Sequence, residues 1–104
     1  MARTKIRIQY TDPQIANQKA GNILSLNGYK LINENGENVW TCGMGLLAAV
    51  KYVKIEFNND NTLTLSGWIK TTVPAEEQDL NGFVGAIPKK QVKNILKEIQ
   101  SAIK

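Results

Sequence analysis

Alternating hydrophobic and polar residues mark the strands of this chain. In residues 3–10, Ile6, Ile8 and Tyr10 alternate with basic or polar residues, which is the two-residue period of a strand with one face in water. Similar runs, rich in residues that favour strands, occupy residues 29–34, 37–42, 51–57 and 62–70. The pattern predicts a strand at each of these places.

The spacing of apolar residues elsewhere is typical of amphipathic helices. Asp12 as N-cap, Pro13 at the first helical position and a stop at Asn27-Gly28 predict a helix over residues 13–26. Pro88 opens a second helix, in which an apolar stripe lies opposite a row of lysines. The stripe consists of Val92, Ile95, Leu96, Ile99, Ala102 and Ile103, and the row of Lys89, Lys90, Lys93, Lys97 and Lys104.

The dipeptide Asn35-Gly36 predicts a type I′ hairpin turn, which needs positive φ at both central residues. A two-residue loop places Glu34 opposite Glu37, and opposed residues share a face of the sheet. We expect the larger and more apolar of the two resulting sets in the core. That set is Tyr29, Leu31, Trp40 and Cys42, whereas Lys30, Ile32, Val39 and Thr41 take the other face.

Strand parity also constrains the next connection. Val53, Ile55 and Phe57 share a face with Leu63 and Leu65 only if the loop has an odd number of residues. A three-residue loop at 58–60 satisfies this condition. We interpret residues 71–87 as a long loop with a solvated acidic cluster and, as an option, one short strand at 82–87. The cluster is Glu76, Glu77 and Asp79.

The element order is therefore β-α-β-β-β-β-α over residues 1–104, taken as a single domain. Two amphipathic helices and an antiparallel sheet predict an α+β two-layer sandwich with both helices on one face. The opposite face of the sheet would then be open to solvent or to a partner.

Composition narrows the function classes. The chain has 104 residues, a net charge of +4, one cysteine and no histidine. The absence of histidine removes the commonest general base and metal ligand, so we expect no catalytic residue, no metal site and no cofactor. No run reaches the roughly 18 apolar residues of a membrane span, and the charged N-terminus does not fit a signal peptide. We expect a cytoplasmic location and no stable membrane insertion.

Several segments together resemble a small bacterial domain family of unknown function. They are Gly43-Met44-Gly45-Leu46-Leu47, Val53-Lys54-Ile55-Glu56, Ser66-Gly67-Trp68-Ile69 and residues 82–90, which read GFVGAIPKK. The resemblance covers about residue 28 to the C-terminus and implies no activity, ligand or catalytic residue. The element order is also analogous to one half of the TATA-binding-protein fold and, more loosely, to the helix-grip fold, and a shared fold does not carry function.

The open face of the predicted sheet is the first candidate site. It would present basic side chains around exposed aromatic rings, a combination that binds single-stranded nucleic acid through phosphates and stacked bases. A protein partner, a homodimer contact and a plain solvated surface are the alternatives. The residues concerned are Arg3, Lys5, Arg7, Lys30, Tyr52, Lys54, Trp68 and Lys70.

The apolar segment 44–50 is the second candidate site. Met44, Leu46 and Leu47 would insert into a membrane surface or the groove of a partner, or they would fold back as a cap on the core. Cys42, beside Tyr29, is expected to be a small buried hydrophobe and not a nucleophile.

These observations predict a non-enzymatic protein-interaction domain that associates with itself or another protein through the open sheet face and the apolar segment 44–50. A nucleic-acid-binding sheet is the alternative. The third hypothesis is a lipid or hydrophobic-ligand module, with a cavity between the C-terminal helix and the sheet. That cavity would be lined by Tyr29, Leu31, Trp40, Phe57, Ile95 and Ile99.

Overall fold

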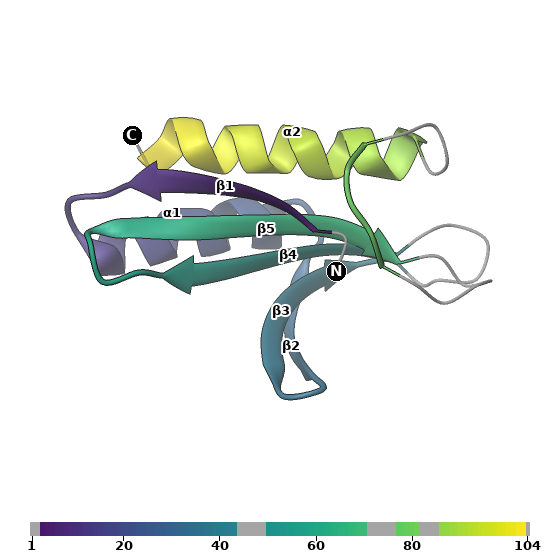
Figure 1. Cartoon of the computed structure of the whole chain (residues 1–104), viewed down its shortest axis with the longest axis horizontal. Coiled ribbons are helices and arrows are strands. Elements are labelled where there is room, and N and C mark those ends of the chain that lie inside the picture. Colours follow the sequence, from purple (N-terminus) through teal and green to yellow (C-terminus); the bar gives the residue numbers. More distant parts are fainter. Residues whose placement is uncertain (1–2, 44–49, 71–76, 82–85, 104) are drawn as a thin grey trace.

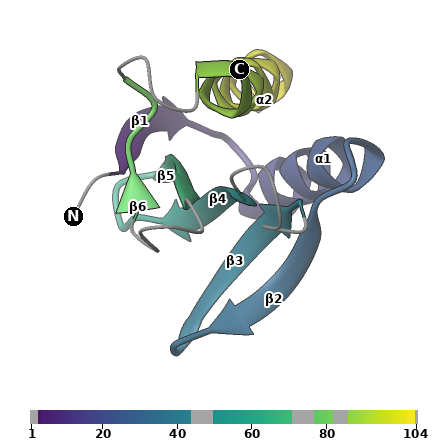
Figure 2. The same ribbon diagram turned by 90° about the vertical axis from the view of Figure 1, so that its right-hand side faces the viewer.

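The computed structural model of the chain describes residues 3–43, 50–70, 77–81 and 86–103. The elements follow the order β-α-β-β-β-β-β-α, and the strands form one antiparallel sheet. Figures 1 and 2 show both helices on the same side of the sheet, beside each other. The predicted α+β class and two-layer arrangement are confirmed.

The sheet has the strand order β1-β5-β4-β3-β2, so β5 and β4 are central and β2 is an outer edge. A short β6 pairs with β5 beyond the end of β1. The strands are β1 (Thr4–Gln9), β2 (Lys30–Glu34), β3 (Glu37–Cys42), β4 (Val50–Phe57), β5 (Thr62–Lys70) and β6 (Glu77–Gln78). The helices are α1 (Pro13–Leu26) and α2 (Ala86–Ile103).

Helix α1 has the predicted bounds. The side chain of Asp12 accepts hydrogen bonds from the backbone N–H groups of Gln14 and Ile15, which have no partner inside the helix. At the other end Asn27 is the C-cap and Gly28 has φ +84°, a conformation that glycine adopts without a steric penalty.

Helix α2 begins at Ala86, two residues before the predicted start at Pro88. Proline fits there because N–H groups of the first turn need no partner in the helix. The predicted strand at 82–87 is therefore wrong at its last two residues, and its first four lie outside the described residues. The extra strand that the structure describes is β6.

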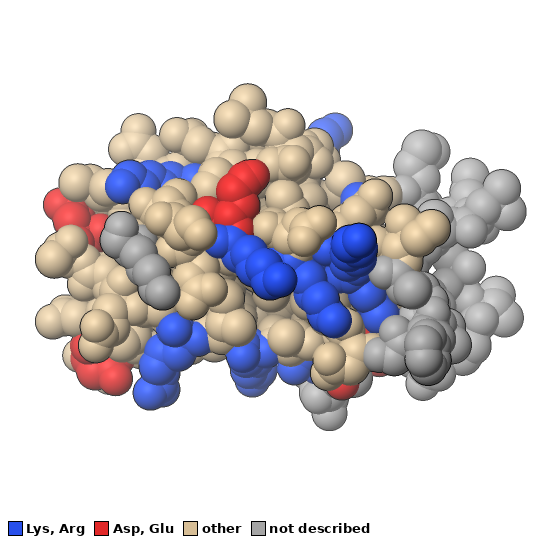
Figure 3. Space-filling view, turned by 90° about the horizontal axis from the view of Figure 1, so that it is seen from above, with Lys and Arg blue, Asp and Glu red and all other residues tan. Residues whose placement is uncertain are grey.

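The lysines of α2 do not all face water as predicted. Figure 3 looks onto this helix and shows basic side chains spread along its outer surface, where Lys90, Lys93 and Lys97 are exposed. Lys89 differs, because it is only 5% exposed and its Nζ donates a hydrogen bond to the carbonyl oxygen of Asn81. One basic residue of the row thus ties α2 to the segment that follows β6.

Both hairpins keep the predicted parity. Asn35 and Gly36 have positive φ, and β2 pairs with β3 in the predicted register. In the β4–β5 hairpin the register is shifted by two residues, because Asn58 donates its N–H to the Thr62 carbonyl at 2.8 Å. The three-residue loop is therefore 59–61, with Asn61 at positive φ.

The main core lies between the helices and the sheet. It is built from Val53, three residues of β5, and the buried faces of both helices. Phe57 was expected in this core, but it is 41% exposed at the end of β4, where its ring forms an edge-to-face pair with that of Tyr10. The central members are Ala20, Leu24, Val53, Leu63, Leu65, Ile69, Val92, Leu96 and Ile99.

The β2–β3 hairpin leaves this layer part of the way along. Strand β3 pairs with β4 only from Trp40 to Cys42. From Trp40 towards its turn, the hairpin bends away from the helices, as Figure 2 shows. Tyr29 is buried in the main core, as predicted. Trp40 and Cys42 pack against that core on the predicted face but are only half-buried. Leu31 is 56% exposed because it lies on the part that has left the helices, so its predicted core position is wrong.

Candidate functional site

The bent hairpin covers the part of the opposite sheet face that carries Tyr52 and Trp68. Trp68 and Tyr52 are 2% and 5% exposed, and they pack with Val39 of β3 into a second apolar cluster. The two rings stack with their centroids 5.2 Å apart and their planes 1° from parallel. The expectation that these rings are exposed for stacking on bases is therefore wrong.

Arg3 covers the outer side of Trp68, with its guanidinium carbon 3.7 Å from the ring centre. The guanidinium makes two hydrogen bonds to Glu37, at 2.9 and 3.0 Å, and two to Glu77, at 2.9 and 2.8 Å. Its side chain is only 9% exposed. Arg3 thus joins the start of β1, the hairpin and β6, and its charge is neutralised within the fold.

Two more of the predicted basic residues have acidic partners. The Nζ of Lys54 lies 2.9 Å from Glu37, and that of Lys70 lies 3.9 Å from Glu34. Tyr52 donates its hydroxyl to Glu34 at 3.2 Å, and burial, followed by the charge of Glu34, raises the pKa of this tyrosine. We call Arg3, Glu34, Glu37, Lys54, Lys70 and Glu77 the ion-pair network.

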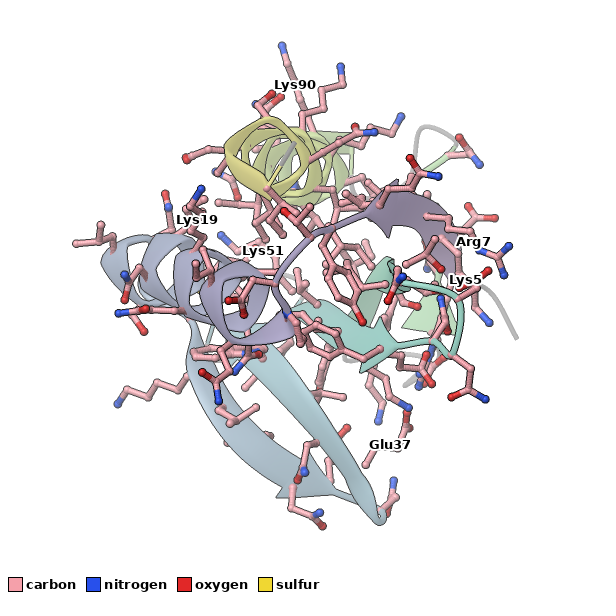
Figure 4. All side chains as sticks on the ribbon, turned by 90° about the vertical axis from the view of Figure 1, so that its left-hand side faces the viewer. Lys5, Arg7, Lys19, Glu37, Lys51 and Lys90 are labelled. Atoms are coloured by element: carbon pink, nitrogen blue, oxygen red, sulfur yellow. The ribbon has the colours of Figure 1, made fainter. Side chains whose placement is uncertain are left out.

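Lys5, Arg7 and Lys30 lie apart from this network. Figure 4 shows Lys5 and Arg7 pointing outward at the β1 edge, while Glu37 lies below the sheet beside the hairpin. Lys30 is exposed on β2, at the opposite edge of the sheet. The structure therefore brings together five of the eight predicted face residues and separates the other three.

The residues of the second candidate site, Met44, Leu46 and Leu47, lie outside the described residues. The structure therefore leaves both hypotheses for segment 44–50, contact site and core cap, as predictions.

The ion pairs that hold the hairpin against the sheet should contribute less stability at acid pH. Hydrogen bonds from Arg3, and next from Lys54, lower the pKa of Glu37 from 4.5 to about 2. The folded state thus binds this proton less readily than the unfolded chain, so the stability gained from Glu37 is complete above pH 4.5 and is lost as the pH falls towards 2. The pKa of Glu77 is lowered in the same way, chiefly by Arg3.

We expect the free energy of unfolding to fall more between about pH 5 and pH 2 in the unmodified protein than in Glu37→Gln, which has no charge to lose. Since 31% of the Glu37 side chain is exposed and water screens its ion pairs, the difference should be about 1 kcal/mol. Urea unfolding at several pH values measures it. An identical pH dependence of the two proteins would contradict the role of Glu37.

The outer edge of β2 is the most exposed strand surface of the described chain. Lys30, Leu31, Ile32 and Asn33 are all exposed, with Leu31 at 56% and Ile32 at 37%. Their apolar side chains point to opposite faces of the strand. Among the described residues no strand pairs with this edge of β2, which therefore offers backbone groups together with apolar side chains on both faces.

Residue spacing alone missed the acidic members of the network, Glu34, Glu37 and Glu77, and the second cluster around Val39. One signal was present in the sequence. The hairpin register sets Glu34 directly opposite Glu37, and like charges in that position destabilise a strand pair unless cations lie nearby. Both glutamates also share the face that carries Lys54 and Tyr52, which identifies the source of those cations.

The expected ligand cavity does not have its predicted lining. Leu31 and Phe57 are exposed, and Ile99 is fully buried. A depression of about 290 Å³ adjoins Tyr29 and Ile95. Apart from these two residues its walls are polar: Asn27, Lys51, Gln91, Asn94 and Glu98.

Within the part of the chain that the structure describes, no three histidine, cysteine, aspartate or glutamate residues lie close enough together to hold a metal ion. Neither described helix is long and apolar enough to span a membrane.

Comparison with protein-family models, curated protein sequences and solved structures finds no match to this chain. The resemblance to a bacterial domain family and the analogy with half of the TATA-binding-protein fold therefore stay predictions.

Proposed function

We propose that this chain is a non-enzymatic, cytoplasmic protein-interaction domain whose contact element is the edge strand β2. The observation that carries the proposal is the exposure of Leu31 and Ile32 on an outer strand. Most proteins protect such an edge with charged side chains, proline, a bulge or a covering segment. The sequence of β2, KLINE, has charged residues only at its two ends, has no proline, and pairs residue by residue with β3 without a bulge.

Strand addition is the mode of recognition that this edge supports. A partner strand would satisfy the outward backbone groups by hydrogen bonds and would cover Leu31 and Ile32 from both faces. The sheet face gives less support, because Tyr52 and Trp68 are buried and Arg3 is paired. The nucleic-acid alternative loses the exposed rings on which it depended.

The test is the double variant Leu31→Thr, Ile32→Thr, since threonine keeps strand propensity and removes much of the apolar surface. We expect the variant to fold and to lose the proteins that co-purify with the tagged unmodified chain from its host. Ile15→Thr is the matched control, because Ile15 is 50% exposed on α1, outside the hairpin. Unchanged co-purification by the double variant would overturn the proposal.

A further inference from the structure

We propose that β2 pairs with β2 of a second copy of the same chain. The two strands would be antiparallel, with the pair centred on Ile32. This inference rests on the proposed function and names its partner. Three independent features of β2 point to it: the direction of its free backbone groups, the order of its charges and its position away from the rest of the fold.

The backbone groups fix which residues can pair. The two-residue turn closes on the hydrogen-bonded pair Glu34 and Glu37, and pair types alternate from there along the hairpin. Ile32 and Val39 are hydrogen-bonded to each other, whereas Leu31 and Asn33 are at non-hydrogen-bonded positions and direct their N–H and C=O groups outward. The free edge therefore offers the backbone groups of Leu31 and Asn33.

A two-fold axis at Ile32 uses all of these groups. Leu31 of one copy then lies opposite Asn33 of the second copy, and each pair exchanges two N–H···O=C hydrogen bonds. The two Ile32 residues meet at the axis as a non-hydrogen-bonded pair, in which side chains approach most closely. Each isoleucine thus gains an apolar neighbour for a side chain that is 37% exposed in the single chain.

The same register matches the charges. Lys30 lies opposite Glu34 of the second copy, and the two-fold axis repeats this pair at the other end of the strand. Opposite charges that face each other across a strand pair stabilise it. Glu34 already contacts Tyr52 and Lys70, but its side chain is 37% exposed and its carboxylate has further acceptor positions.

Neighbouring registers do not fit as well. An axis at Leu31 places Asn33 opposite Tyr29, whose N–H already donates to the Leu24 carbonyl at 2.9 Å. An axis at Asn33 places Leu31 opposite Asn35, a turn residue with φ 53°. Both alternatives also separate Lys30 from Glu34 of the second copy, so only the axis at Ile32 satisfies backbone and charges together.

The hairpin projects far enough for two copies to meet. Figures 1 and 2 show β2 and β3 extending away from the helices and from the remaining strands, with β2 on the outside. A contact through one five-residue strand per copy is smaller than a standard protein interface, so we expect a weak dimer that forms at high protein concentration.

Disulfide trapping tests the register. In a Cys42→Ser background, Ile32→Cys places two cysteines at the axis, within the Cα separation that a disulfide requires. Asn33→Cys is the matched control, because its two copies are offset along the strands beyond that range. We expect oxidation to cross-link Ile32→Cys at least tenfold faster than Asn33→Cys. Equal rates would overturn the register.

Charge exchange tests the pairing without cysteines. Lys30→Glu and Glu34→Lys should each weaken self-association at least tenfold, and an equimolar mixture of the two variants should associate again, since every facing pair is then opposite in charge. Sedimentation over a range of concentrations measures this, and thermal melts check that Glu34→Lys stays folded without its contact to Tyr52.

Two results would overturn self-pairing: an unmodified chain that stays monomeric at millimolar concentration, or a mixture that does not associate. Either result would leave the proposed function standing if the variant Leu31→Thr, Ile32→Thr no longer co-purifies with host proteins. If host proteins still co-purify with that variant, the proposed function is contradicted, whatever the result on self-pairing.

Discussion

Replacing Trp68 by alanine should lower the free energy of unfolding by about 3–5 kcal/mol, the range observed when a buried aromatic residue is truncated. Trp68 is 2% exposed, with Tyr52 stacked on one side and Arg3 on the other. Removing the indole leaves a cavity and also leaves the Arg3 guanidinium without the ring that it covers. The loss should therefore fall in the upper part of that range.

Urea unfolding followed by circular dichroism measures the change, and two variants control for it. Trp68→Phe keeps a ring against Tyr52 and should lose clearly less stability than the alanine variant. Lys5→Ala lies on the exposed β1 edge and should change stability by less than about 0.5 kcal/mol. A loss below about 1 kcal/mol in Trp68→Ala would mean that the ring is not buried in solution, and would restore the stacking surface expected from the sequence.

Local signals predicted the elements of this fold closely. The cap at Asp12, the stop at Asn27-Gly28 and the turn at Asn35-Gly36 each depend on a few neighbouring residues, and α1 and the first hairpin register follow them. The odd length of the β4–β5 loop was also predicted correctly, because the apolar residues of both strands must lie on the same face of the sheet. The exact loop was missed by one residue, since several polar residues in 58–61 tolerate the turn.

Burial of the second sheet face was not predictable from these local signals. Strand parity shows which residues share a face, but it does not show what covers that face. The part of the hairpin between its turn and Trp40 separates from β4. Glu37, which lies on this part, reaches Arg3 from across the sheet. That contact joins residues 34 positions apart, and no periodicity in either strand reports it.

The bend of the hairpin also explains why the candidate site differs from the predicted one. Five of the eight residues predicted to form a basic, aromatic surface hold the hairpin in place, and the bend that buries Tyr52 and Trp68 also exposes Leu31. In a flat sheet with its helices over the whole face, Leu31 would lie in the core beside Trp40. The strand order makes β2 an edge, and the bend of the hairpin both removes the predicted surface and exposes Leu31 on that edge.

The second large effect is expected at Gly67, where two side chains of α2 pack close against the backbone of β5. A Cβ at this position would lie 2.9 Å from Cγ1 of Val92, 3.0 Å from Cδ1 of Leu96 and 3.2 Å from Cδ1 of Leu80. All three side chains are buried, so none can move aside into solvent. Gly67→Ala should therefore lower the free energy of unfolding by about 1–3 kcal/mol through overpacking.

A double-mutant cycle separates this steric cause from any other effect of the substitution. Val92→Ala removes the nearest methyl groups, so the double variant should be less destabilised than the sum of the two single variants. Additive losses, measured by urea unfolding, would show that the new methyl group and Val92 do not collide.

Gly21 on α1 is a matched control, because alanine at this position should raise the free energy of unfolding. A Cβ there would lie 3.6 Å from the Trp40 ring, an ordinary contact distance, and alanine restrains the unfolded chain and favours the helix. Gly21→Ala should raise stability by about 0.5–1 kcal/mol. The same methyl group should thus stabilise one glycine position and destabilise the other. Neither glycine has a positive φ, so backbone strain does not explain the difference. Helix propensity adds to the gain at Gly21, whereas the loss at Gly67 would be due to the lack of space between α2 and β5.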